Sequence, residues 1–232
     1  MSLRLNEPLL PMSPERSAWM DRLAHDLRGP LSPLSTAAKL LRDPALGEAD
    51  RQELLDVVDR QCARLGRMID EVSDWMRAEK GRLIVRQEPH ELQVLLANVT
   101  MGLRAPLPTV LIAAEAESAQ VRGDSLRLGQ LLRILLTQQL EATPHPPELH
   151  VTVPAPDRVR LSRIIPFRNA GQLDCGQLLL HPWPEPGDGG LGLAWPIARA
   201  IAEAHGGTLT CRTEGEDTIE FTVELPTVPA GV

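Results

Sequence analysis

Residues 25–31 read His-Asp-Leu-Arg-Gly-Pro-Leu and contain the side chains best suited to chemistry. An apolar stripe with alternating spacings of three and four predicts a helix here; its members are Met20, Leu23, Leu27, Pro30, Leu34, Ala37 and Leu41. His25 falls on the opposite face of that helix, so we expect its ring in solvent. An exposed, neutral imidazole is a nucleophile that can meet another protein. A lone exposed histidine is more often an ordinary surface residue, so its neighbours decide between the two interpretations.

Those neighbours favour a functional site. Pro30 lacks the N–H that would bond the carbonyl of Asp26, which predicts a helix bent and opened beside His25. Arg28 shares the face of His25 and can hold a phosphate oxygen. Gly29 costs about 1 kcal/mol of helix propensity. A Gly-Pro pair inside an otherwise strong helix indicates that the distorted backbone beside His25 serves a function.

Residues 25–31 resemble the H-box of bacterial two-component sensor histidine kinases. The resemblance implies that His25 is phosphorylated on a ring nitrogen and exchanges the phosphoryl group with an aspartate of a response-regulator receiver domain. It also implies that Asp26 orients and activates the ring. Many members carry Thr or Asn where this chain has Gly29, to position water for dephosphorylating the receiver, which puts phosphatase activity in question.

A helical hairpin surrounds this segment. Ser13 as N-cap and Pro14 at the first position predict a helix to about Arg42, followed by a turn over residues 43–47. A second helix continues the three-four spacing at Leu55, Val58, Cys62, Leu65, Ile69, Val72 and Met76. A two-helix hairpin cannot bury such a stripe alone, so either two copies form a four-helix bundle or the stripe packs on the rest of the chain. The resemblance favours the homodimer.

The pattern changes after a hinge predicted at residues 80 and 81. We expect strands at 82–86, 109–113, 149–153, 159–165 and 219–225, and helices at 91–103, 125–141 and 193–205. This order predicts a sheet covered by helices on one face. Residues 82–226 resemble the catalytic, ATP-binding domain of the same kinases. The expected fold class is therefore α+β, with a tail (1–13), a dimeric antiparallel helical hairpin (14–80) and a histidine-kinase-type α/β sandwich (82–228).

A glycine-rich run before the last predicted helix is the candidate nucleotide site. Backbone N–H groups at a helix start form a cradle for phosphate, and this run resembles the second glycine box of the kinases. Its candidate residues are Gly187, Gly189, Gly190 and Gly192. Taken alone, such a run is usually a plain turn.

Other features of the nucleotide site depart from the family. Gln138 stands where the family has an Asn that holds Mg²⁺, and its extra methylene suits octahedral coordination poorly. Glu141 adds negative charge where the triphosphate would sit. Residues 168–172 are the best fit to the first glycine box, but Arg168 and Asn169 replace the Asp that accepts from adenine, and a guanidinium has no acceptor. We therefore expect no bound cofactor, with Mg-ATP binding lost, and no metal site.

Three further residues in this part are expected to be structural. The segment that forms the ATP lid in the family is short and rich in proline, at Pro182, Pro184 and Pro186. We expect Trp183 and Trp195 to be packing residues. His205 reads as a helix end followed by a left-handed glycine, not as a catalytic base.

Composition limits the class of protein and the kinds of partner. The 232 residues are 43% hydrophobic and 24% charged, which is typical of a globular chain, and the net charge of −7 argues against nucleic-acid binding. The cysteines Cys62, Cys175 and Cys211 lack metal-ligand spacing and favour a reducing compartment. There is no apolar run of the roughly 20 residues that crosses a membrane and no signal peptide, so we expect a cytoplasmic protein that does not bind membranes.

The sequence leaves three functions open. The first is a phosphotransfer protein that uses His25, Asp26 and Arg28 between a partner histidine kinase and a receiver aspartate, with ATP binding lost. The second is an atypical ATP-dependent autokinase that uses Gln138 and the glycine-rich run. The third is a non-catalytic pseudokinase that pairs with or blocks another kinase.

Overall fold

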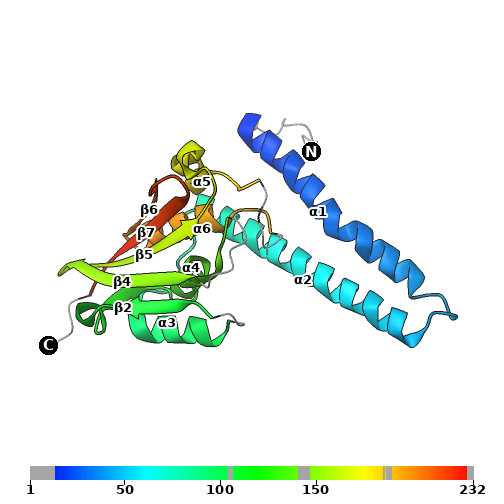
Figure 1. Ribbon diagram of the computed structural model, residues 1–232, viewed down its shortest axis with the longest axis horizontal. Coiled ribbons are helices and arrows are strands. Elements are labelled where there is room, and N and C mark those ends of the chain that lie inside the picture. Colours follow the sequence, from blue (N-terminus) through cyan, green and yellow to red (C-terminus); the bar gives the residue numbers. More distant parts are fainter. Residues whose placement is uncertain (1–13, 104–106, 141–146, 185, 187–189, 229–232) are drawn as a thin grey trace, which may run out of the picture. The chain divides into compact units, whose positions relative to one another are not determined.

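The computed structural model describes residues 14–103, 107–140, 147–184, 186 and 190–228, with side chains from residue 22 onward (Figure 1). The chain forms two compact units that divide between Met68 and Ile69. Each unit is described by itself. In the described part of the chain, no helix combines the length and the apolar composition needed to cross a membrane.

The first unit contains an antiparallel helical hairpin, as predicted. Helix α1 (Pro14–Leu40) runs through Pro30 and Pro33 without interruption, and α2 (Glu48–Glu79) begins in this unit and ends in the next. The Asp43 carboxylate accepts the N–H of Ala45 in the turn, and the Arg51 guanidinium donates to the carbonyl of Leu41.

The α1 stripe faces inward and the α2 stripe is largely open. Pro30 and Ala37 are buried, and the other described members of the α1 stripe are half-buried. On α2, by contrast, Leu55, Ile69 and Met76 are 42%, 59% and 49% exposed. One chain therefore leaves an apolar seam on α2 uncovered.

The second unit is built on a five-stranded sheet (Figure 1). The strands lie in the order β2-β4-β5-β7-β6, and only the β2–β4 pair is parallel. Their bounds are β2 Thr109–Ile112, β4 Glu148–Ala155, β5 Arg158–Pro166, β6 Thr208–Thr213 and β7 Thr218–Pro226. A separate antiparallel pair is formed by β1 (Glu88–Glu91) and β3 (Gln120–Gly123).

Helices cover one face of this sheet. They are α3 (Leu92–Met101), α4 (Ser125–Thr137), α5 (Cys175–Leu180) and α6 (Ala194–Ala204). Every second residue of β7 is buried toward them, and on that face the ring of Trp195 stacks on Phe221 with 3.6 Å between ring centroids. The predicted α/β sandwich is confirmed, because this alternation buries one side of the sheet and leaves the other exposed.

Two expectations about the elements of this unit are wrong, and four short elements were missed. Residues 82–86 are not a strand, because the N–H groups of Val85 and Arg86 donate to the Asp124 carboxylate instead of to a neighbouring strand. Helix α4 ends at Thr137 and not at residue 141. The short elements β1, β3, β6 and α5 were not predicted, since four to six residues carry little periodicity.

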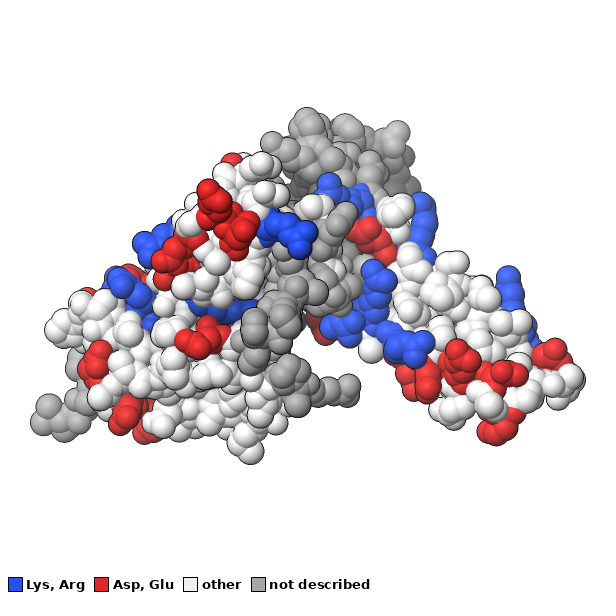
Figure 2. Space-filling view, in the orientation of Figure 1, with Lys and Arg blue, Asp and Glu red and all other residues white. Residues whose placement is uncertain are grey.

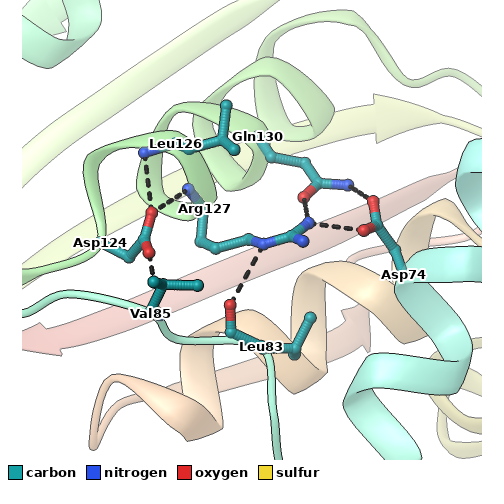
Figure 3. Close-up of polar contacts among 7 residues, drawn as sticks. All are labelled: Asp74, Leu83, Val85, Asp124, Leu126, Arg127 and Gln130. Carbon is teal, nitrogen blue, oxygen red and sulfur yellow. Dashed lines mark hydrogen bonds and ion pairs between the residues drawn. The ribbon is translucent and has the colours of Figure 1, made fainter.

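A buried polar network joins the last turns of α2 to α4 (Figure 3). Arg127 donates from Nη1 to Asp74 (2.6 Å) and to Gln130 (2.7 Å), and Gln130 donates to the second oxygen of Asp74 (2.7 Å). The Nε of Arg127 donates to the carbonyl of Leu83 (3.2 Å). Residues 69–79 thus pack with the second unit, which is why the units divide before the hinge predicted at residues 80 and 81.

Asp124 caps α4 and also binds the linker between α2 and β1, at Val85 and Arg86 (Figure 3). One carboxylate oxygen accepts the N–H groups of Leu126 and Arg127, and the other accepts those of Val85 and Arg86. Burial alone would raise the pKa of this carboxyl, but the four donors outweigh burial and hold the pKa below its ordinary value.

A second contact fixes the start of α4 against the end of α6. The backbone N–H of Asp124 donates to Nε2 of the buried His205 ring, whose Nδ1 donates to the carbonyl of Ile201. A Cβ at Gly123 would overlap the same ring. His205 is followed by Gly206 with φ +73°, so it is a helix end with a left-handed glycine, as expected.

Replacing Arg127 with Met should lower the free energy of unfolding by about 3 kcal/mol, because it leaves the Asp74 carboxylate, 13% exposed, without its cation. Urea denaturation measures the loss. Arg160→Met is the control, since Arg160 pairs with Glu224 in solvent and should change stability by less than about 1 kcal/mol. Equal effects of the two substitutions would contradict a structural role for the network.

Asp124 should make stability depend on pH. Its folded pKa is depressed, so its contribution is present at neutral pH and is lost as the pH falls below about 4, the ordinary carboxyl range. Asp124→Ala should cost about 2 kcal/mol at pH 7, and the gap between the variant and the wild type should narrow on acidification. A gap that stays constant from pH 7 to pH 3 in urea melts would refute this account.

Candidate functional site

His25 is presented to solvent on α1, as predicted. Its side chain is 84% exposed, and Nδ1 lies 3.2 Å from Oδ1 of Asp26. With Asp26 ionised, Nδ1 carries the hydrogen and donates it, which leaves the lone pair of Nε2 free. The ring is therefore exposed and in contact with a carboxylate through one of its two nitrogens.

The neighbours of His25 leave space for a reacting group. Arg28 and Gly29 are both exposed, and a Cβ added at Gly29 would meet no atom within 4 Å. Packing in this chain therefore does not require a glycine there. Pro30 is buried on the inward face, so the Gly-Pro pair separates an open surface from the hairpin core.

Several arginines lie on α1 and α2 within about two helical turns of the height of His25. His25 lies 16 residues before Leu41, and Arg67 lies 16 residues after Arg51, which contacts the Leu41 carbonyl. Because both helices rise by the same distance per residue, His25 on α1 and Arg67 on α2 lie at the same height along the hairpin. The basic collar consists of Arg22, Arg28, Arg60, Arg64 and Arg67, which are exposed or half-buried. The acids Asp26, Asp59 and Asp70 lie in the same stretch of the two helices.

Acidic side chains occupy the other end of the hairpin. Figure 2 shows Asp and Glu gathered at the loop, and Lys and Arg farther along the visible face. The exposed acids of the loop end are Asp43, Glu48, Asp50, Glu53 and Asp56. A charged partner is thus directed toward one end of the hairpin rather than to its whole length.

In the second unit, the glycine-rich run is only partly described. Gly187 and Gly189 lie outside the described residues, and Gly190 is buried. Gly192 has φ +75°, its carbonyl accepts the N–H of Trp183, and a Cβ there would overlap the Trp183 backbone. Its requirement for glycine is therefore explained by a close approach of two backbone segments.

A carboxylate of α2 accepts two backbone N–H groups at the end of this run, on either side of Gly192. Glu71 accepts the N–H groups of Leu191 (2.9 Å) and Leu193 (3.3 Å), directly before α6. This contact could not be predicted from local sequence, because the partners are 120 and 122 residues apart.

Gln138 does not lie on a helix. It is the C-cap of α4, with extended backbone (φ −69°, ψ 131°), and its side chain is half-buried. Helix α4 stops early because the buried guanidinium of Arg163, from β5, takes the carbonyl of Leu135, which would otherwise bond the next turn. Burial lowers the pKa of Arg163 to about 10. Glu141 lies outside the described residues.

Residues 168–172 and Trp183 make local contacts within the second unit. Asn169 is left-handed (φ 58°), and its N–H donates to Asp217, so residues 168–172 form a tight turn. The ring of Trp183 packs edge-on against Phe167 at 5.8 Å. Among the residues that the structure describes, no group of three His, Cys, Asp or Glu side chains could hold a metal ion.

Residues 15–81 match the family model of the His Kinase A (phospho-acceptor) domain. Among curated proteins, the chain is 28% identical to the sensor protein DivL of Caulobacter vibrioides over 90% of this chain and 28% of DivL. It is 27% identical to the nitrogen regulation protein NtrY of Azorhizobium caulinodans over 82% of this chain and 26% of NtrY. The chain therefore spans about a quarter of the length of these relatives.

Solved structures share the fold. The histidine kinase AdeS of Acinetobacter baumannii superposes with a TM-score of 0.62 at 17% identity, over 87% of this chain and 97% of AdeS. Full-length ShkA, solved in complex with AMPPNP, gives 0.58 at 20% identity, over 95% of this chain and 47% of that one. Both confirm a hairpin followed by a catalytic-type sandwich.

Proposed function

We infer that this chain is a member of the two-component sensor histidine kinases and that His25 accepts and donates a phosphoryl group. The match of residues 15–81 to the phosphoacceptor family model, the similarity to DivL and the fold shared with AdeS support this inference. The observation that supports this most directly is the His25–Asp26 contact, which leaves Nε2 free on an exposed ring. Phosphotransfer needs a neutral imidazole and an orienting carboxylate, and it needs no nucleotide.

The transfer step follows from these atoms. The Nε2 lone pair attacks the phosphorus of a receiver acyl phosphate, a P–N bond forms, and the P–O bond to the receiver aspartate breaks to release its carboxylate. The ring becomes a cation, which the Asp26 carboxylate stabilises through Nδ1–H. Arg28 pairs with a phosphate oxygen. Transfer to a receiver is the same reaction in reverse.

The basic collar fits an acidic partner. A phosphorylated aspartate and the acidic groups around it would face Arg22, Arg28 and Arg60, all exposed in this chain. Such complementarity raises the rate of encounter more than the final affinity. A response-regulator receiver domain is therefore the proposed partner, with a histidine kinase as the source of phosphate.

We propose that the second unit does not bind Mg-ATP. Gln138 is off the helix, Glu71 occupies two amides before α6, and Trp183 lies against the glycine-rich run. The autokinase is the second candidate, favoured by the fold shared with ShkA, which was solved with AMPPNP.

We propose a homodimer through the open seam of α2. Leu55, Ile69 and Met76 recur at helical spacing, and all are more than 40% exposed. A second copy would bury this stripe in a four-helix bundle. The coiled-coil spacing favours an identical helix over an unrelated surface.

His25→Ala should abolish labelling of the protein by phosphorylated receiver domains, because it removes the only proposed acceptor atom. The expected wild-type label is acid-labile and base-stable, and [γ-³²P]ATP alone should give none. His150→Ala is the matched control, since His150 is also a surface histidine, 48% exposed, beside a carboxylate.

Two results would overturn the proposal. A label that survives His25→Ala would place the acceptor elsewhere, and no label from any receiver or kinase would favour the pseudokinase. Labelling of His25 by ATP alone would support the autokinase.

The double substitution Leu55→Glu and Ile69→Glu should give a monomer in light scattering, because it places charges in the apolar seam. Val94→Glu is the control, as Val94 is an equally exposed apolar residue of α3 (50%) away from the seam. A wild type that is itself monomeric at tens of micromolar would rule out this dimer.

A further inference from the structure

The carboxylate of Glu71 accepts two backbone N–H groups directly before α6. The N–H groups of Leu191 and Leu193 both point to one oxygen of Glu71, at 2.9 and 3.3 Å. No side chain of α6's own N-cap residue, Leu193, supplies a cap. The start of α6 is therefore capped by a charge from a helix 120 residues earlier in the chain.

The two amides can serve only one anion at a time. The first N–H groups of a helix lack partners within the helix and carry a partial positive charge, so they attract carboxylate and phosphate alike. A phosphate oxygen approaching Leu191 and Leu193 would have to displace Glu71 and would meet the repulsion of its charge.

Glu71 is also held in place. Asp74 lies three residues further along α2, on the same side of the helix, and is fixed by Arg127 and Gln130. Because this part of α2 is already fixed, the Glu71 side chain loses little conformational entropy when it binds the two N–H groups. It therefore competes well with a free anion for them.

We propose that Glu71 is an internal ligand that closes the amides before α6 to phosphate groups. Phosphate access then depends on the position of the last turns of α2, because any movement of α2 that withdraws Glu71 opens the amides. The inference rests on the part of the proposed function in which the second unit does not bind nucleotide, and it is independent of phosphotransfer by His25.

Hydrogen exchange of the full-length protein tests the contact directly. In Glu71→Ala, the amides of Leu191 and Leu193 should exchange at least about tenfold faster than in the wild type, because their acceptor is gone. Asp70→Asn is the matched control: it removes one negative charge from the adjacent, exposed position and should leave both amides protected. Unchanged exchange in Glu71→Ala would overturn the inference.

Binding of inorganic tripolyphosphate tests the competition without requiring adenine recognition. By calorimetry, Glu71→Ala and Glu71→Gln should bind it at least about tenfold more tightly than the wild type and Asp70→Asn. Circular dichroism checks that each variant is folded, and Glu71→Gln, which keeps the shape of the side chain, serves if Glu71→Ala is not.

The outcomes separate the two levels of the proposal. Equal, weak binding by wild type and folded Glu71 variants would overturn the role of Glu71 alone. Tight binding of Mg-ATP by the wild type would overturn the proposed loss of nucleotide binding and this inference with it.

Discussion

The ion pair of Arg127 and Asp74 is the interaction on which the second unit's organisation depends. Its charged groups are mostly removed from water, and Gln130 and the Leu83 carbonyl complete their hydrogen bonds. Burying such a pair is worth little in net stability unless every partner is satisfied, so its effect is to fix geometry. It fixes the end of α2, the linker and the start of α4 to one another, and Asp124 strengthens the same junction.

The two units differ in whether their polar groups are exposed to solvent or hydrogen-bonded within the protein. In the first, His25 keeps a ring nitrogen unpaired in solvent, which phosphotransfer requires. In the second, backbone groups near the start of α6 are engaged within the protein: Glu71 accepts the N–H groups of Leu191 and Leu193, and the N–H of Trp183 donates to the carbonyl of Gly192. These polar groups therefore serve the packing of the sandwich itself.

Local pattern was enough to predict the hairpin, the exposure of His25 and the strands β2, β4, β5 and β7, since each corresponds to a run of apolar residues at helical or strand spacing. It failed where a distant residue decides the local structure. Helix α4 ends where it does because Arg163 donates to the Leu135 carbonyl, and residues 82–86 are not paired as a strand because Asp124 accepts the N–H groups of Val85 and Arg86. Glu71 looked like any acid on the surface of α2. Such contacts join residues 28 to 120 positions apart and leave no mark in a local window.

The contact between Gly123 and His205 has a consequence for how related sequences can vary. The ring fills the space that any side chain at position 123 would need, while its two nitrogens link β3's end to the last turn of α6. Substitutions at the two positions are therefore linked. A larger residue at position 123 requires a smaller one at position 205, and loss of the His205 ring leaves the N–H of Asp124 without its acceptor. The two positions should therefore covary, and an alignment would reveal them as a coupled pair although 82 positions separate them.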